Sequence, residues 1–74
     1  MNTLENKANR PLRVLRLPMV REKTGLSTTA IYMAMAEGVF PRPIPIGSKT
    51  RGWVEHEIDA YLERLIAERD ASSG

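Results

Sequence analysis

The sequence contains no cysteine, one histidine and only four aromatic residues, which are one Trp, two Tyr and one Phe. Without cysteine the chain forms neither disulfide bonds nor thiolate–metal bonds, and a single histidine cannot build a zinc site. A domain of 74 residues also has a small core, whose net stabilisation rarely exceeds about 3–5 kcal/mol. The fold must therefore rest on compact apolar packing, which self-association or a bound ligand can supplement.

Long apolar runs and catalytic patterns are missing as well. No segment approaches the roughly 18 consecutive apolar residues of a membrane-spanning helix, and residues 1–7 lack the apolar stretch of a secretory signal. His56 lies among carboxylates, and no glycine-rich phosphate loop is present. We therefore expect a cytoplasmic protein that is not an enzyme and that needs no metal, cofactor or small-molecule ligand.

The charges of the chain are unevenly distributed. Residues 1–53 carry nine Lys or Arg against three Glu, whereas residues 54–74 carry two Arg against six Asp or Glu. A basic body with an acidic terminal segment favours a polyanion as the partner of the first part. Ordinary surface charge is the alternative interpretation of this distribution taken alone.

We expect three regions along the chain. Residues 1–13 are predicted to form a flexible arm, residues 14–70 one folded domain, and residues 71–74 a disordered tail. The domain is predicted to be mainly α-helical with a small β-hairpin. Its first helix covers about residues 17–25, because Pro18 suits a first helical turn and Gly25 suits the position just past a helix end.

A second helix is predicted over about residues 28–37, and it ends at Gly38. Ser27 stands where the N-cap residue should be, and its hydroxyl can accept a hydrogen bond from a free backbone N–H. At 100° per residue, one side of this helix is predicted to face the core and consists of Ile31, Ala34 and Met35.

An extended segment and a last helix follow. Three prolines spaced two apart, at positions 41, 43 and 45, exclude a helix but suit an edge strand. We predict a β-hairpin over about residues 43–53, with a basic tip. From Val54 onward a last helix is predicted from a single apolar stripe formed by Val54, Ile58, Tyr61, Leu62, Leu65 and Ile66.

This order of elements is that of a winged helix-turn-helix, which suits duplex DNA because a helix fits the major groove and a basic hairpin can lie on phosphates. The exposed side of the second helix carries hydroxyl, small and apolar groups, and Glu37 is its only charge. Tyr32 alternatively belongs to the core, and Met33 alternatively is merely tolerated or contacts a second subunit. The residues of this recognition helix predicted to contact DNA are Ser27, Thr28, Thr29, Tyr32 and Met33.

Cations around the hairpin are the second group of candidate DNA contacts. Protection of an edge strand is their alternative role. Arg13 and Arg16, just before the first helix, are further candidates for contacts to the DNA backbone, although solvated arginines are equally common there. Trp53 is expected to anchor the hairpin to the core rather than stack on a base. The wing residues predicted to contact DNA are Arg42, Ser48, Lys49, Thr50 and Arg51.

Six short motifs carry a family resemblance, and their order and spacing are more specific than any one of them. The motifs are Arg16-Leu17-Pro18, Thr24-Gly25-Leu26-Ser27, Ile31-Tyr32, Glu37-Gly38-Val39-Phe40-Pro41-Arg42-Pro43, Gly52-Trp53-Val54-Glu55 and Glu57-Ile58-Asp59-Ala60-Tyr61-Leu62. Over roughly residues 14–66 the chain resembles the AlpA family of prophage transcriptional regulators. The resemblance implies a MerR-like winged-helix domain whose recognition helix covers residues 27–37 and whose wing covers about residues 43–53.

The resemblance further implies regulation of genes on prophages and integrative elements. Many members act as excisionases for a tyrosine integrase, and such factors tend to bind repeated sites cooperatively and to bend DNA. Family members often carry a basic residue where Thr28 stands and a polar or basic one where Met33 stands, so this chain departs from the family in its recognition helix. Affinity must then come from the wing, the arm or several copies acting together.

Two hypotheses of function follow. The first is a nucleoid-associated bacterial protein that binds double-stranded DNA as a transcriptional regulator, an excisionase or both, with a tyrosine integrase and further copies of itself as possible partners. The second is a protein-interaction module that does not bind DNA directly, with Met33 and the acidic last helix as contact surfaces.

Overall fold

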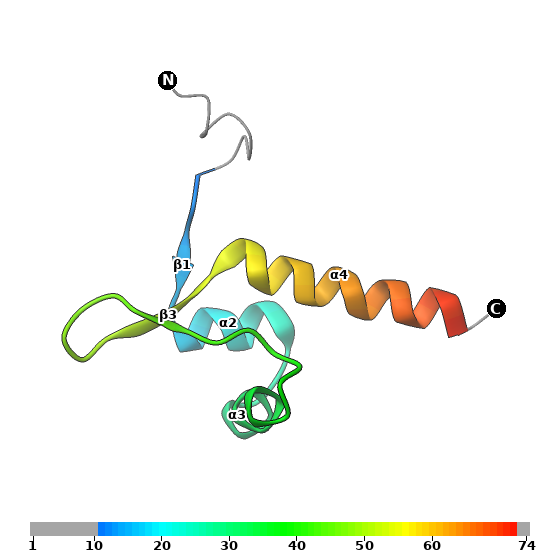
Figure 1. The fold of residues 1–74 in the computed structure, drawn as a ribbon, viewed down its shortest axis with the longest axis horizontal. Helices are drawn as coiled ribbons and strands as arrows, with labels where there is room; N and C mark the ends of the chain where they lie inside the picture. Colours follow the sequence, from blue (N-terminus) through cyan, green and yellow to red (C-terminus); the bar gives the residue numbers. More distant parts are fainter. Residues whose placement is uncertain (1–10, 73–74) are drawn as a thin grey trace.

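The computed structural model describes residues 11–72. Its elements in chain order are β1 (Val14–Leu15), α2 (Leu17–Thr24), α3 (Thr28–Ala36), β2 (Ile44–Pro45), β3 (Arg51–Val54) and α4 (Glu55–Ser72). Figure 1 shows α2 and α3 below a small sheet, with the β2–β3 hairpin and α4 projecting in opposite directions. The predicted fold, a mainly α-helical winged helix-turn-helix with a small hairpin, is confirmed.

The sheet has one more strand than the sequence predicted. Its order is β1-β3-β2, and both pairs are antiparallel. Leu15 of β1 pairs with Trp53, and Ile44 of β2 pairs with Gly52, so β3 is the central strand. Two-residue strands are too short to show the alternation by which a strand is recognised in a sequence, and β1 is therefore identified only from its partner.

The turn between α2 and α3 has the predicted caps. Gly25 follows α2 in the left-handed conformation, with φ of 79°, and its N–H donates to the carbonyl oxygen of Arg21 at 2.7 Å. Ser27 is the N-cap of α3, and its Oγ accepts a hydrogen bond from the N–H of Ala30 at 3.1 Å. These two caps end one helix and begin the next within three residues, which sets the angle at which α3 leaves α2.

The core takes one buried side chain from every element except β2. The indole Nε1 of Trp53 donates to the carbonyl oxygen of Pro41 at 3.0 Å, so Trp53 anchors the hairpin to the core as predicted. The ring of Tyr61 packs edge-on against Phe40, with 4.7 Å between centroids. Ala34 and Met35 pack against this core beside Ile31, as predicted for that side of α3. The buried core residues are Leu15, Val20, Ile31, Phe40, Trp53 and Ile58.

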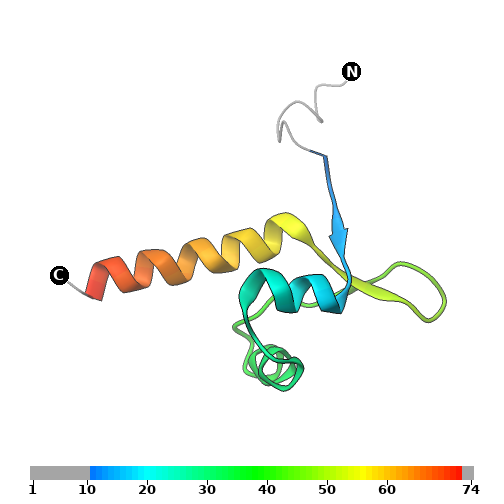
Figure 2. The ribbon, with the colours of Figure 1, turned by 180° about the vertical axis from the view of Figure 1, so that it is seen from behind.

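Helix α4 is packed only over its first half. Ile58 is fully buried and Leu62 is partly covered, whereas 42% of Leu65 and 49% of Ile66 are exposed. Figure 2 shows the reason, since the second half of α4 extends past the rest of the domain. The helix ends at Ser72, two residues beyond the predicted limit of the domain. Within residues 11–72, no helix is long and apolar enough to cross a membrane.

An ion cluster joins α2 to the start of α4. The ammonium group of Lys23 lies 2.8 Å from Glu55 Oε2 and 2.8 Å from Asp59 Oδ1. Hydrogen bonds to Asp59 and Glu55 raise the pKa of Lys23 above its ordinary value of 10.5. The cluster therefore joins α2, the first helix of the helix-turn-helix, to the first turns of α4.

Candidate nucleic-acid interface

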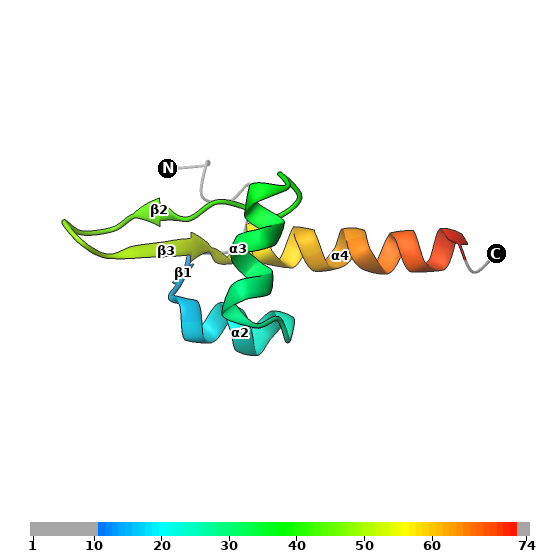
Figure 3. The ribbon, with the colours of Figure 1, turned by 90° about the horizontal axis from the view of Figure 1, so that it is seen from below.

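The outer side of α3 is the most exposed apolar surface of the helix-turn-helix. The exposed fractions are 58% for Met33 and 48% for Tyr32, and Thr29 and Ala36 are exposed as well. Thr28 is half-buried. Figure 3 shows α3 lying across the near face of the domain, with no other element in front of it. Nothing in residues 11–72 therefore covers the side of α3 that the sequence predicted to be free.

The sequence left Tyr32 between the core and the DNA-contacting side, and it gave Ser27 two roles, as the N-cap of α3 and as a DNA contact. Tyr32 is not among the residues packed on the core, so the alternative that placed it there is wrong. The Oγ of Ser27 is engaged by the N–H of Ala30, which makes Ser27 a capping residue whose side chain is exposed at the end of α3.

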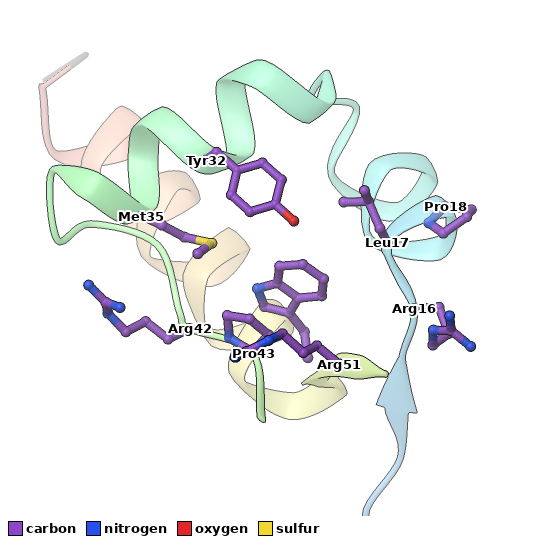
Figure 4. Close-up of a pocket in the computed structure, with 9 residues that line it drawn as sticks. Arg16, Leu17, Pro18, Tyr32, Met35, Arg42, Pro43 and Arg51 are labelled. Carbon is purple, nitrogen blue, oxygen red and sulfur yellow. The ribbon is translucent and has the colours of Figure 1, made fainter. Parts of the chain in front are cut away.

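A pocket of about 460 Å³ lies between α3, the start of α2 and the wing. Figure 4 shows Tyr32 projecting from α3 toward the start of α2, while Arg16 and Arg42 stand on opposite sides of the pocket with Arg51 between them. The pocket is lined by both apolar side chains and arginines. The lining residues are Arg16, Leu17, Pro18, Tyr32, Met35, Arg42, Pro43, Arg51 and Trp53.

The basic side chains divide into two groups by their partners. Lys23, Arg64 and Arg69 form ion pairs with carboxylates of α4, and Arg13 lies 3.7 Å from Glu55 Oε1. The second group has neither an ion pair nor a hydrogen bond from its side chains to other residues in the part of the chain that the structure describes. It consists of Arg16, Arg21, Arg42, Lys49 and Arg51.

Four of these cations lie near α3, and the fifth, Lys49, lies in the hairpin loop. Arg21 lines a shallow hollow beside Ser27, at the N-terminal end of α3, and Arg16, Arg42 and Arg51 line the pocket beside Tyr32. Sequence reasoning did not single out Arg21. A signal was available, because Arg21 is a basic residue of the predicted helix that leads directly into the turn before α3.

The remaining predicted residues lie away from the pocket. Ser48, Lys49 and Thr50 form the tip of the hairpin, where the N–H of Ile46 donates to the carbonyl oxygen of Thr50 at 2.8 Å. Arg13 precedes β1 and is directed to Glu55, so it belongs to the ion cluster at the start of α4. The structure therefore brings together Arg16, Tyr32, Arg42 and Arg51, and separates Arg13 and the hairpin tip from them.

The described residues contain no group of three or more His, Asp or Glu side chains placed to hold a metal ion. The arrangement supplies an uncharged helix face with cations at its flanks. Such an arrangement can hold a polyanion at its edges while the helix meets uncharged groups between them.

Comparisons with known proteins agree with the motif pattern. The family model for the prophage CP4-57 regulatory protein (AlpA) matches residues 13–66, from the residue before β1 into the second half of α4. The chain is 37% identical over 59 residues to the DNA-binding transcriptional activator AlpA of Escherichia coli (strain K12), covering 72% of this chain and 84% of that protein.

A phage protein is similar to the same degree. Identity is 37% over 57 residues to the uncharacterized protein ORF88 of Enterobacteria phage P4, covering 77% of this chain and 65% of the phage protein. No solved structure matches the chain. Since the family model covers β1 to α4 and both relatives share more than a third of the aligned residues, the chain belongs to the AlpA family of prophage regulatory proteins.

Proposed function

We propose that this protein binds double-stranded DNA and regulates a prophage or integrative element. In this proposal α3 enters the major groove, and the β2–β3 hairpin lies on the adjacent backbone. The observation that carries the proposal is the position of four cations without a partner in the described chain, Arg16, Arg21, Arg42 and Arg51, which lie near α3 while the paired cations lie on or beside α4. The name of the Escherichia coli relative, a DNA-binding transcriptional activator, supports it.

Phosphates on the two sides of the groove would be contacted by different elements. In this proposal Arg42 and Arg51 contact one strand from the wing side, and Arg21 contacts a phosphate near the N-terminal end of α3. Tyr32 stands between α3 and Arg16, where its hydroxyl can donate to a phosphate oxygen. These contacts position the protein on the duplex, and they carry no sequence information of their own.

The salt dependence of binding tests this function. If the five unpaired cations, Arg16, Arg21, Arg42, Lys49 and Arg51, each displace a counterion, the logarithm of the binding constant should fall against log salt with a slope of about −4 to −5. The measurement is fluorescence anisotropy of a labelled duplex at a series of salt concentrations. A slope near zero contradicts the proposal.

The same contacts serve a transcriptional regulator and an excisionase, and we propose that the protein acts in one or both of these roles. A tyrosine integrase and further copies bound cooperatively on adjacent sites are the partners of the excisionase role. Footprinting on DNA that flanks the gene and the attachment site of the element separates the roles. Protection of a promoter alone supports regulation, whereas repeated protection at the attachment site supports excision.

One observation favours the second candidate, a protein-interaction module. Leu65 and Ile66 are exposed on the half of α4 that projects from the domain. Analytical ultracentrifugation of the free protein tests this surface, and replacing both residues by Ala should abolish any self-association that it mediates. A module without DNA binding would leave the anisotropy of the duplex unchanged at every salt concentration.

A further inference from the structure

Helix α3 lacks the side chains that read bases by paired hydrogen bonds. Arg or Lys recognises guanine, Asn or Gln recognises adenine, and Asp or Glu accepts from cytosine. Residues 28–36 include none of these six residue types. Glu37, which can accept a hydrogen bond from cytosine, follows this segment as the C-cap of α3.

Methyl groups form a line along the exposed side of α3. Thr29, Met33 and Ala36 stand at positions i, i+4 and i+7, so they share one side of the helix, and all three are exposed. Met33 dominates this line, with 58% of the residue exposed. We call these three residues the methyl stripe.

The charges next to the methyl stripe indicate which chemical group it contacts. The cation Arg21 lies beside Ser27 at the N-terminal end of α3, and Arg51 lines the pocket that Tyr32 and Met35 of α3 also line, so positive charge lies next to α3 at two places, as a helix bound between phosphate strands requires. Between those strands the major groove offers one apolar group, the C5-methyl group of thymine. A helix whose free side carries the methyl groups of Thr29, Met33 and Ala36 and no charge is complementary to that feature.

We propose that the methyl stripe recognises thymine by its C5-methyl group, so that the target sites of this protein carry thymines at the positions facing Thr29, Met33 and Ala36. This inference rests on the proposed binding of DNA. It goes further, because it names the base and the chemical group that set the sequence preference. The hydroxyl of Thr29 adds a hydrogen bond to a neighbouring base edge or phosphate.

Replacing thymine by uracil tests the inference, because uracil lacks only the methyl group. The full chain is used to select duplexes from a randomised library, and the enriched duplex is made with thymine or with uracil at each enriched thymine position. We expect affinity to fall about fourfold for each contacted methyl group removed, the factor that corresponds to about 0.8 kcal/mol for one buried apolar carbon. The salt slope should not change.

A variant cycle assigns the effect to α3. In Met33→Ala the thymine-to-uracil ratio should fall toward one at the position that Met33 faces. Met19→Ala is the matched control, since Met19 is 47% exposed on α2 and lies outside the stripe, and its ratio should equal that of the unmodified protein. Circular dichroism checks that both variants are folded.

The outcomes are distinct. Equal affinity for the two duplexes with a steep salt slope overturns thymine recognition and leaves DNA binding standing, and so does a library that enriches no thymines. If the loss of affinity on replacing thymine by uracil is as large in Met33→Ala and in Thr29→Ala as in the unmodified protein, the assignment to the methyl stripe is overturned. Absence of binding to any duplex removes the proposed function and this inference together.

Discussion

Single residues decide how the chain turns between the two helices of the helix-turn-helix. The left-handed Gly25 and the capping Ser27 act through hydrogen bonds to residues within four positions. Interactions of such short range are visible in the order of residue types, and both caps were predictable. Gly52 differs, because its lack of a side chain matters for a contact with a strand almost 40 residues earlier.

Gly52→Ala tests that contact. A Cβ at this position would overlap Val14 Cγ1 and lie 3.1 Å from the carbonyl oxygen of Leu15, so the Val14 side chain must rotate or β1 must shift away from β3. We expect the free energy of unfolding to fall by about 1–3 kcal/mol, as for other overpacked sites. Urea denaturation followed by the fluorescence of Trp53 measures it. Gly47→Ala in the same hairpin is the control, because its Cβ would make only ordinary contacts, at 3.6 Å to Thr50.

At the scale of elements, the apolar stripe of α4 is buried along only part of its length. Its apolar stripe is continuous in sequence, yet Ile58 is fully buried while Leu65 and Ile66 remain exposed. The periodicity of a helix determines which side is apolar, but the length of the neighbouring elements determines how much of that side is covered. The first turns of α4 are joined to α2 by the ion pairs of Lys23 with Glu55 and Asp59.

The stability contributed by Lys23 should disappear at alkaline pH. Because the folded state raises its pKa above 10.5, the contribution is complete below that value and is lost as pH rises through the raised pKa. The difference in melting temperature between the unmodified protein and Lys23→Met should therefore shrink above about pH 10.5. For Lys49→Met, which removes a lysine without a carboxylate partner in the described chain, the difference should stay constant.

At the scale of the whole molecule, the fold separates two kinds of cation. Those beside α4 are neutralised by its carboxylates, as in the Arg69–Asp70 pair at 2.9 Å, and those beside α3 are left unpaired. Net charge does not reveal this division, because it sums both kinds. The proposed interface depends on the unpaired group alone.

Arg51→Ala and Arg69→Ala remove the same charge from the two groups. Arg51→Ala should weaken binding to all duplexes by a similar factor and reduce the magnitude of the salt slope by about 1. Arg69→Ala should change neither quantity, because Arg69 already has a partner at the far end of α4. The measurement is anisotropy over a salt series with two unrelated duplexes. Equal effects of the two substitutions would show that only net charge matters.

The sequence by itself determined the helices, their caps, the proline-bounded hairpin and the apolar sides of α3 and α4. Each of these follows from neighbouring residues or from a period of a few residues. Only the tertiary structure decided that β1 joins the sheet and that Arg13 turns to Glu55. It also decided that, within residues 11–72, half of α4 is uncovered and neither Arg16 nor Arg21 has a carboxylate partner. The physical reason is that these features depend on contacts between residues distant in the chain, and such contacts leave no periodic pattern in a single sequence.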